Sequence, residues 1–360
     1  MLRCILMAIG RPACLLALLI TGLCGCFSPE YGPDPFSCVA SERCPEGYRC
    51  IEGVCRTGAI PDGSGGDGSW PDLLPPDLHR MDGPESDSPL PKDIGVAPPG
   101  SWATIKAGTF TMGDTTNETC KKEYPETVHA VTLTHDFEMQ TTEVTQGWFQ
   151  TLMGYNPSFF SACGTSCPVD QVTWHEAVAY CNTLSKQKGL ALCYGCTGSP
   201  QNPTCTVAAA YAKQKIYDCP GYRLPTEAEW EHAYRAGTTT SFYNGPLKSC
   251  TDEDTTASMI GWYGFNSSDK THPVGQKKAN AWGLFDMAGN VCEWCHDWFQ
   301  NDLGSAVVTD PWGAGASGTI PVRGGHWRDH PRNVRAPART DDLPDWKGWE
   351  NGFRCVRSLP

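Results

Sequence analysis

The sequence of residues 100–360 predicts one α+β domain with much irregular structure, and three observations support this interpretation. Short stretches that alternate apolar and polar residues come first, as expected of strands. Stretches with apolar residues at helical spacing follow them. Beyond Gly237 the chain is rich in Gly, Trp and Asn and has few long periodic runs. The length of this segment suits a single domain.

Three strands are expected near the start of this domain. Trp102 to Ala107 and Thr109 to Met112 flank a turn at Ala107 and Gly108. Residues Val128 to Leu133 alternate apolar and polar side chains, which suits a half-buried sheet.

The helices have recognisable starts. Thr173 with Glu176, and Thr226 with Glu229, have the spacing of capping boxes. Each pair is followed by apolar residues at helical spacing, which predicts one buried face per helix. A shorter helix is expected from Thr145 to Met153, ended by a glycine.

The first residues indicate export. A basic start and a short apolar run lead to Leu23-Cys24-Gly25-Cys26, which fits a bacterial lipobox with Cys26 as the lipidated residue. The apolar run is too short to span a membrane, so residues 1–25 are interpreted as a lipoprotein signal peptide; a plain secretory signal or a retained anchor is the alternative. Phe27, in place of aspartate, suggests sorting to the outer membrane. We therefore expect an exported protein, anchored by lipid alone at the bacterial outer membrane or cell surface.

The chain has 20 cysteines, which in an exported protein indicates disulfides. Residues 26–57 hold Cys38, Cys44, Cys50 and Cys55, and crosslinks are expected to replace a core in so short a module. Zinc is the alternative there, but the gaps of five, five and four residues differ from its usual ligand spacing. Residues 192–220 are expected to form a loop stapled by Cys193, Cys196, Cys205 and Cys219, and Cys163 with Cys167 to close a smaller one.

Residues 58–99 predict a linker, because Pro, Gly, Asp and Ser leave too little apolar surface for a core. Eight acidic and two basic residues give this segment a charge of −6, half of the −12 of the whole chain. Half of the net negative charge of the chain therefore lies in this linker. The negative charge argues against nucleic-acid partners.

The domain resembles the formylglycine-generating enzyme, or sulfatase-modifying factor, family (FGE-sulfatase domain). Its hallmark blocks match, in the family's order, Phe137–Thr145, Pro168–Cys181, Tyr222–Glu231 and Gly283–Trp294. Val322–Cys355 resembles the family's C-terminal core. The resemblance implies a compact, partly irregular fold of the formylglycine-generating enzyme type, distantly similar to C-type lectins. It places copper(I) on two cysteine thiolates in the catalytic members, which oxidise a substrate cysteine.

The positions that match those two cysteines are Asp329 and Val334, so bound copper is not expected. His326, Asp329 and His330 are candidate ligands for zinc or non-haem iron, if the backbone brings them together. The alternative is a surface loop that uses these polar residues for hydrogen bonds. Cys355 is interpreted as one half of a structural disulfide.

Two further motifs suggest ligand sites. By resemblance, Asp286 and Glu293 would bind calcium through side-chain oxygens, and Gly289 and Val291 through carbonyls. The alternative is that Asp286 caps a turn and Glu293 pairs with an arginine such as Arg323. The spacing Cys292-Glu293-Trp294-Cys295-His296 is that of c-type haem attachment. The family block has tryptophan where Cys292 stands, so haem is not expected.

Two classes of function follow. In the first, the domain is a calcium-stabilised binding or accessory module, whose groove holds a peptide, glycan or exported protein at the cell surface. The groove residues would be Trp327, Arg335, Arg339 and Arg354, with Trp346 and Trp349 nearby. Alternatively, these side chains form core and ion-pair structure. In the second class, the domain is an oxidoreductase that modifies an exported protein such as a sulfatase.

Overall fold

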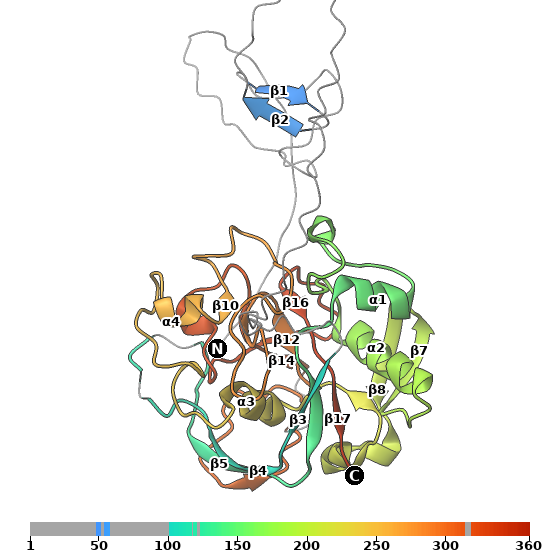
Figure 1. Cartoon of the computed structure of the whole chain (residues 1–360). Coiled ribbons are helices and arrows are strands. Elements are labelled where there is room, and N and C mark those ends of the chain that lie inside the picture. Colours follow the sequence, from blue (N-terminus) through green and yellow to red (C-terminus); the bar gives the residue numbers. More distant parts are fainter. Residues whose placement is uncertain (1–47, 52–53, 58–100, 117, 121–122, 314–317) are drawn as a thin grey trace, which may run out of the picture. The chain divides into compact units, whose positions relative to one another are not determined.

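The computed structural model describes residues 48–51, 54–57, 101–116, 118–120, 123–313 and 318–360 (Figure 1). The chain divides into two compact units, Met1–Ser86 and Asp87–Pro360. In the first unit, β1 (Tyr48–Ile51) and β2 (Val54–Thr57) form an antiparallel pair in which Cys50 lies opposite Cys55. The proposed signal peptide with Cys26, the linker, Cys38 and Cys44 lie outside the described residues.

One sheet of the second unit brings together the two ends of its sequence. Its strand order is β3-β6-β17-β9, with antiparallel neighbours throughout. The strands are β3 (Trp102–Ile105), β6 (Phe137–Gln140), β17 (Val356–Ser358) and β9 (Tyr222–Arg223). A second sheet, ordered β13-β5-β4, contains β4 (Gly108–Met112), β5 (His129–Leu133) and β13 (Val308–Thr309). The three strands expected from the sequence are thus confirmed to within two residues.

A third sheet carries the candidate site. Its order is β15-β14-β12-β16, formed by β12 (Cys292–Trp294), β14 (Ile320–Arg323), β15 (Thr340–Asp342) and β16 (Asn351–Gly352). Two smaller pairs complete the strands: β7 (Tyr194–Ser199) with β8 (Asn202–Val207), and β10 (Gly261–Trp262) with β11 (Ala288–Gly289).

The helices begin where the capping boxes predict. They are α1 (Gln146–Met153), α2 (Trp174–Gln187), α3 (Glu227–Arg235) and the short α4 (Thr255–Ser258), with 3-10 turns at Ser161–Cys163, Ala209–Tyr211, Lys213–Asp218 and Pro331–Asn333. Both predicted capping boxes, at the starts of α2 and α3, are formed. In Figure 1, α1 and α2 lie side by side, and the β7–β8 hairpin packs beside α2. Within the described ranges, no helix is both long and apolar enough to cross a bilayer.

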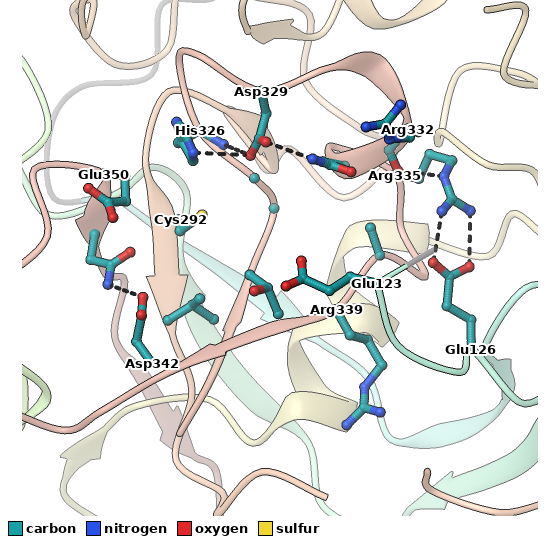
Figure 2. A pocket seen from close by; sticks show the side chains of 17 residues that line it. Glu123, Glu126, Cys292, His326, Asp329, Arg332, Arg335, Arg339, Asp342 and Glu350 are labelled. Carbon is teal, nitrogen blue, oxygen red and sulfur yellow. Dashed lines mark hydrogen bonds and ion pairs between the residues drawn. The ribbon is translucent and has the colours of Figure 1, made fainter. Parts of the chain in front are cut away.

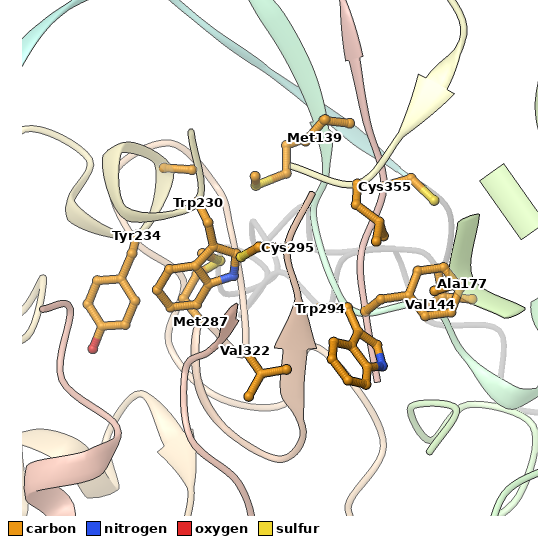
Figure 3. Close-up of a cluster of buried hydrophobic side chains, with 14 of the residues drawn as sticks. Met139, Val144, Ala177, Trp230, Tyr234, Met287, Trp294, Cys295, Val322 and Cys355 are labelled. Atoms are coloured by element: carbon orange, nitrogen blue, oxygen red, sulfur yellow. The ribbon is translucent and has the colours of Figure 1, made fainter. Parts of the chain in front are cut away.

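Tryptophan side chains fill the centre of the core (Figure 3). Trp230 of α3 and Trp294 of β12 are fully buried, and both indole N–H groups are satisfied. Trp294 Nε1 donates to the Val172 carbonyl at 2.9 Å, and Trp230 Nε1 donates to Glu293 Oε2 at 2.8 Å. The core therefore contains polar contacts as well as apolar packing.

Disulfides staple the loops, as expected. Cys163–Cys167 is bonded as the sequence suggested, and the four cysteines of the 192–220 loop, whose connectivity the sequence left open, pair as Cys193–Cys219 and Cys196–Cys205; Cys120–Cys250 adds a long-range link. The expectation that Cys355 is half of a disulfide is wrong for this structure. Its Sγ lies 3.3 Å from Cys181 Sγ, and both remain buried free thiols.

Thr226→Ala is expected to lower the free energy of unfolding by about 1 to 2 kcal/mol. The Thr226 hydroxyl caps α3 by accepting from the Glu229 N–H at 3.2 Å, and it also meets the Tyr217 hydroxyl at 2.9 Å. Chemical denaturation measures the loss. Thr239→Ala, at an exposed position after the same helix, is the control. Equal losses in both variants would contradict the capping explanation.

Candidate functional site

A cavity of about 220 Å³ opens beside the third sheet, against the loop from Gly324 to Arg335 (Figure 2). Figure 2 shows Cys292, Asp342 and Glu350 on one side of it and Arg332 and Arg335 on the other. The lining consists of Glu123, Glu126, Cys292, Val322, Gly324, Gly325, His326, Asp329, Arg332, Asn333, Arg335, Ala338, Arg339, Thr340, Asp342, Glu350 and Asn351.

Backbone geometry in this loop fixes the Asp329 carboxylate. Gly325 has a φ of 65°, and a Cβ there would lie 2.7 Å from Val334 Cγ1. Only glycine fits this close approach without displacement. Asp329 Oδ2 accepts from the His326 N–H at 3.0 Å and lies 3.4 Å from His326 Nε2. Asp329 Oδ1 accepts from the Asn333 amide at 2.7 Å.

The three candidate metal ligands of this loop do not converge. His326 and Asp329 meet, but His330 Nδ1 lies 3.2 Å from the Thr251 carbonyl, and His330 is outside the cavity lining. In the part of the chain that the structure describes, no group of three or more His, Cys, Asp or Glu is arranged to hold a metal ion. The expectation of a three-residue ligand set is wrong because the turn separates His330 from the other two.

The two positions that match the copper ligands of the family are Asp329, a carboxylate, and Val334, a buried apolar side chain. Val334 is fully buried, and its carbonyl accepts from the Tyr234 hydroxyl at 2.9 Å. A thiol does reach the cavity, because Cys292 lines it. Burial raises the pKa of Cys292 well above its usual range, and the Asp329 carboxylate raises it further. Cys292 is therefore a neutral thiol near pH 7, which is a poor nucleophile and a poor ligand for a soft metal.

The haem-like spacing does not form one site. Cys292 faces the cavity, whereas Cys295 lies in the core near Trp230 (Figures 2 and 3). His296 is buried, with Nδ1 3.0 Å from the Tyr194 hydroxyl, and burial lowers the pKa of this imidazole to about 3.

Two of the four expected groove residues line the cavity, and both are already paired. Arg335 binds Glu126 through two hydrogen bonds of 3.0 and 2.7 Å. Arg339 binds Glu227 through hydrogen bonds of 2.6 and 3.0 Å. Their guanidinium groups therefore stabilise the wall of the cavity.

The expected groove is wrong for the other two residues. Arg354 and Trp327 are buried and lie outside the lining. Arg354 donates to both oxygens of Glu293, at 2.7 and 2.6 Å, and the Trp327 ring packs 5.1 Å from the ring of Phe160. Sequence reasoning could not separate these residues from the cavity arginines, because their partners lie far away in the chain.

Glu293 therefore pairs with Arg354, whereas Arg323, the alternative partner that the sequence suggests, binds Glu227 and Glu231. Gly289, the last residue of β11, and Val291, between β11 and β12, are the residues whose carbonyls were expected to bind calcium, and both are buried.

Asp286, the other expected calcium ligand, is also buried. Its Oδ2 accepts from the Gly275 N–H at 2.6 Å, but its Oδ1 has no hydrogen-bond partner. Glu143, which the sequence did not single out, is buried nearby and has an unpartnered Oε1. Burial raises the pKa of Asp286 to about 6 and that of Glu143 well above its usual range; neighbouring carboxylates add to both shifts.

Sequence reasoning also missed two acceptors in the cavity. Glu350 Oε2 and Asn351 Oδ1 are buried oxygens without a hydrogen-bond partner. The Asn351 amide donates to Asp342 Oδ2 at 2.7 Å, which turns its carbonyl oxygen away from that carboxylate. Polar atoms of this kind are costly to bury unless something donates to them.

A second cavity, of about 340 Å³, lies at the start of α3. Asp297 lines it and accepts from the Glu227 N–H at 2.5 Å. Burial raises the pKa of Asp297 to about 8, and the Glu227 carboxylate adds to the shift.

Residues 90–359 match the family described as "Sulfatase-modifying factor enzyme 1-like domain". The chain belongs to this family. A chaperone protein LppX of Paenibacillus barcinonensis is 35% identical over 186 residues, covering 46% of this chain and 64% of the relative. A formylglycine-generating enzyme of Streptomyces coelicolor is 35% identical over 179 residues, covering 44% of this chain and 54% of the relative. The chain thus spans somewhat more than half the length of these relatives.

Solved structures agree with the predicted α+β class and the fold of this family. The Treponema denticola variable protein 1 has 30% sequence identity and a TM-score of 0.58, covering 72% of this chain and 95% of that protein. PvdO from Pseudomonas aeruginosa has 23% identity and a TM-score of 0.55, covering 73% of this chain and all of that one, and it supports the fold alone.

Arg335→Met should lower the free energy of unfolding by about 3 to 5 kcal/mol, because it removes the guanidinium from the buried Glu126. Arg332→Met changes another arginine of the cavity lining, one that is partly exposed, and is the matched control. Denaturant titration of both variants measures the difference. Similar stability of the two variants would mean that the Arg335 pair is not structural.

Stability should fall as pH rises from the ordinary Asp pKa of 3.8 to about 8, because folded Asp297 keeps a proton that the unfolded chain releases. From about pH 6 to about pH 9 the loss due to Asp297 should be roughly 2.7 kcal/mol. Asp297→Asn should remove the Asp297 part of this slope in thermal unfolding, whereas buried carboxyls such as Glu143, whose pKa is also raised, keep their own part. Asp136→Asn should keep the whole slope, since the hydrogen bond from Lys106 lowers the pKa of that exposed carboxyl. A slope unchanged in Asp297→Asn would reject the assignment.

Proposed function

We propose that this domain is a non-oxidase binding module that holds a polypeptide segment of an exported protein in the cavity beside the third sheet. The observation that carries the proposal is the pair of unpartnered acceptors, Glu350 Oε2 and Asn351 Oδ1, in the cavity lining. A bound polypeptide can donate to them through backbone N–H groups or polar side chains, and so offset the cost of their burial.

The chemistry of the lining favours binding over oxidation. Asp329 and Val334 replace the two thiolates that copper(I) requires in the catalytic members of the family. The remaining thiol, Cys292, is held neutral by burial and by nearby carboxylates. The cavity thus offers oxygen acceptors where the oxidases offer sulfur.

Exposed aromatic side chains adjoin the cavity along the chain. Trp349 precedes the lining residue Glu350, is 45% exposed, and packs edge-on against Phe159 at 5.1 Å. Phe159 and Trp346 are 53% and 50% exposed. Large aromatic groups left in water are enriched at protein interfaces, where they add contact area at low entropic cost.

The proposal includes the lipid anchor and the calcium site expected from the sequence. Lipid attachment at Cys26 would hold the protein at the bacterial outer membrane or cell surface, where its ligand would be another exported protein. Calcium bound through the Asp286 loop would stabilise the domain; the unpartnered Asp286 Oδ1 supports this. The relative named as a chaperone protein supports an accessory role, and the relatives named as formylglycine-generating enzymes define the alternative, a sulfatase-modifying oxidase.

Binding to an array of random twelve-residue peptides tests the proposal. The unmodified domain should bind a subset, and the double variant Asp342→Asn with Glu350→Gln should bind it at least about tenfold more weakly. Cys292→Trp should also weaken binding, because the larger side chain fills the cavity. Asp218→Asn alters an exposed carboxylate outside the lining and should bind normally.

Incubation with copper(I), oxygen and a cysteine-containing peptide tests the alternative. We expect mass spectrometry to find no formylglycine. Formation of formylglycine would overturn the non-oxidase proposal. Equal binding by all variants in the peptide array would overturn the assignment of the cavity.

A further inference from the structure

We propose that the cavity beside the third sheet takes a cationic side chain, a lysine or an arginine, from the polypeptide that it binds. This inference rests on the proposed function and names the part of the ligand that enters the cavity. In the oxidases of the family the reacting group is a substrate cysteine, so a cation in this place is not what the resemblance implies.

The size of the cavity suits one side chain. Its volume is about 220 Å³, whereas sites for drug-sized molecules usually measure about 300 to 1,000 Å³ (Figure 2). A bound polypeptide can therefore insert a single residue and leave the rest of its backbone at the opening.

One wall of the cavity offers oxygen acceptors. Asn351 is fully buried and its Oδ1 has no hydrogen-bond partner, while Nδ2 of the same carboxamide donates to Asp342 Oδ2 at 2.7 Å. Glu350 Oε2 is also buried without a partner. A lysine ammonium or an arginine guanidinium carries only N–H donors and no acceptor. Such a group satisfies the oxygens of this wall and adds no acceptor of its own.

The backbone brings these acceptors to one thiol. Cys292 lies opposite Asn351 in the parallel pair of β12 and β16, and the Cys292 N–H donates to the Glu350 carbonyl at 2.8 Å. Burial raises the pKa of the Cys292 thiol, and the carboxylates of Asp329, Asp342 and Glu350 raise it further. Three carboxylates from different segments therefore act on the same small space.

The arginines of the cavity do not neutralise this wall. Arg335 and Arg339 are each held by a glutamate, as described above. Figure 2 shows Arg332 across the cavity from Asp342 and Glu350. No arginine of the described lining forms an ion pair with either of these two carboxylates. The wall is therefore negative, and a cation supplied by the ligand would balance it.

Asp342 shows the effect of this uncompensated charge. Burial raises the pKa of its carboxyl to about 6, and the Glu350 carboxylate adds to the shift. At pH 7 Asp342 is thus mostly ionised, although its surroundings disfavour the charge. An ion of opposite charge beside it would relieve that repulsion, which a neutral or acidic side chain would not do.

Peptide substitution tests the inference. Among random twelve-residue peptides, those bound by the unmodified full chain should each contain lysine or arginine. In the peptide that binds most tightly, each lysine or arginine is replaced in turn by norleucine, which resembles lysine but has no charge. At one position this change should weaken binding at least about tenfold, and glutamate there should weaken it further. Isothermal titration calorimetry measures the affinities.

Variants of the cavity locate the effect. Glu350→Gln should weaken binding of the cationic peptide about tenfold and leave binding of its norleucine counterpart nearly unchanged. Arg332→Met should strengthen binding of the cationic peptide, because it removes a positive charge from the lining. Asp218→Asn changes an exposed carboxylate outside the lining and should alter neither affinity. Thermal unfolding checks that each variant is folded, and the norleucine comparison needs no variant at all.

The outcomes separate this inference from the proposal on which it rests. Bound peptides without lysine or arginine, or equal affinity for a cationic peptide and its norleucine counterpart, would overturn the inference and leave peptide binding intact. An undiminished preference for the cation in folded Glu350→Gln would remove its assignment to this wall. If no peptide of the array binds, the proposed function fails and the inference fails with it.

Discussion

The buried pair between Glu293 and Arg354 organises the centre of this domain. Glu293 lies on β12, and its oxygens also accept from Trp230 of α3. Arg354 uses its remaining donors on the carbonyls of Gln140 and Phe285. One ion pair thus fixes the third sheet, α3, the end of β6 and the loop that leads to Asp286. The strands are short, so the backbone hydrogen bonds between them would hold the helices and strands together only weakly. Directional side-chain contacts such as this ion pair fix their relative positions.

Helix α3 extends this principle. Glu227, Glu229 and Glu231 are buried, and each binds at least one buried arginine. Arg335 and Arg339 line the cavity, but each is ion-paired with a buried glutamate. If the cavity binds a polypeptide, as we propose, its specificity comes from groups outside these pairs, chiefly the unpartnered acceptors of Glu350 and Asn351.

Local patterns predicted the local structure. The capping boxes at Thr173 and Thr226 fixed the helix starts, because both partners lie within one turn of chain. The resemblance located the loop of Asp329 and the loop of Asp286, but it could not reveal that Arg354 turns inward while Arg339 lines a cavity. Those outcomes depend on carboxylates more than fifty residues away in sequence. Glu143 was overlooked for the same reason, since nothing around it in the chain marks its oxygen as unpartnered.

The position of β17 constrains how the domain folds. This strand, from Val356 to Ser358, lies between β6 and β9, so these two strands wait for one that is made much later in the chain. Contacts so distant in sequence slow folding, because a long chain must be ordered before they form. Until β17 is inserted, β6 and β9 have unpaired edges that can bind other chains. The sheet is therefore completed late, when β17 takes its place as one of the two inner strands of a domain whose other strands are already made.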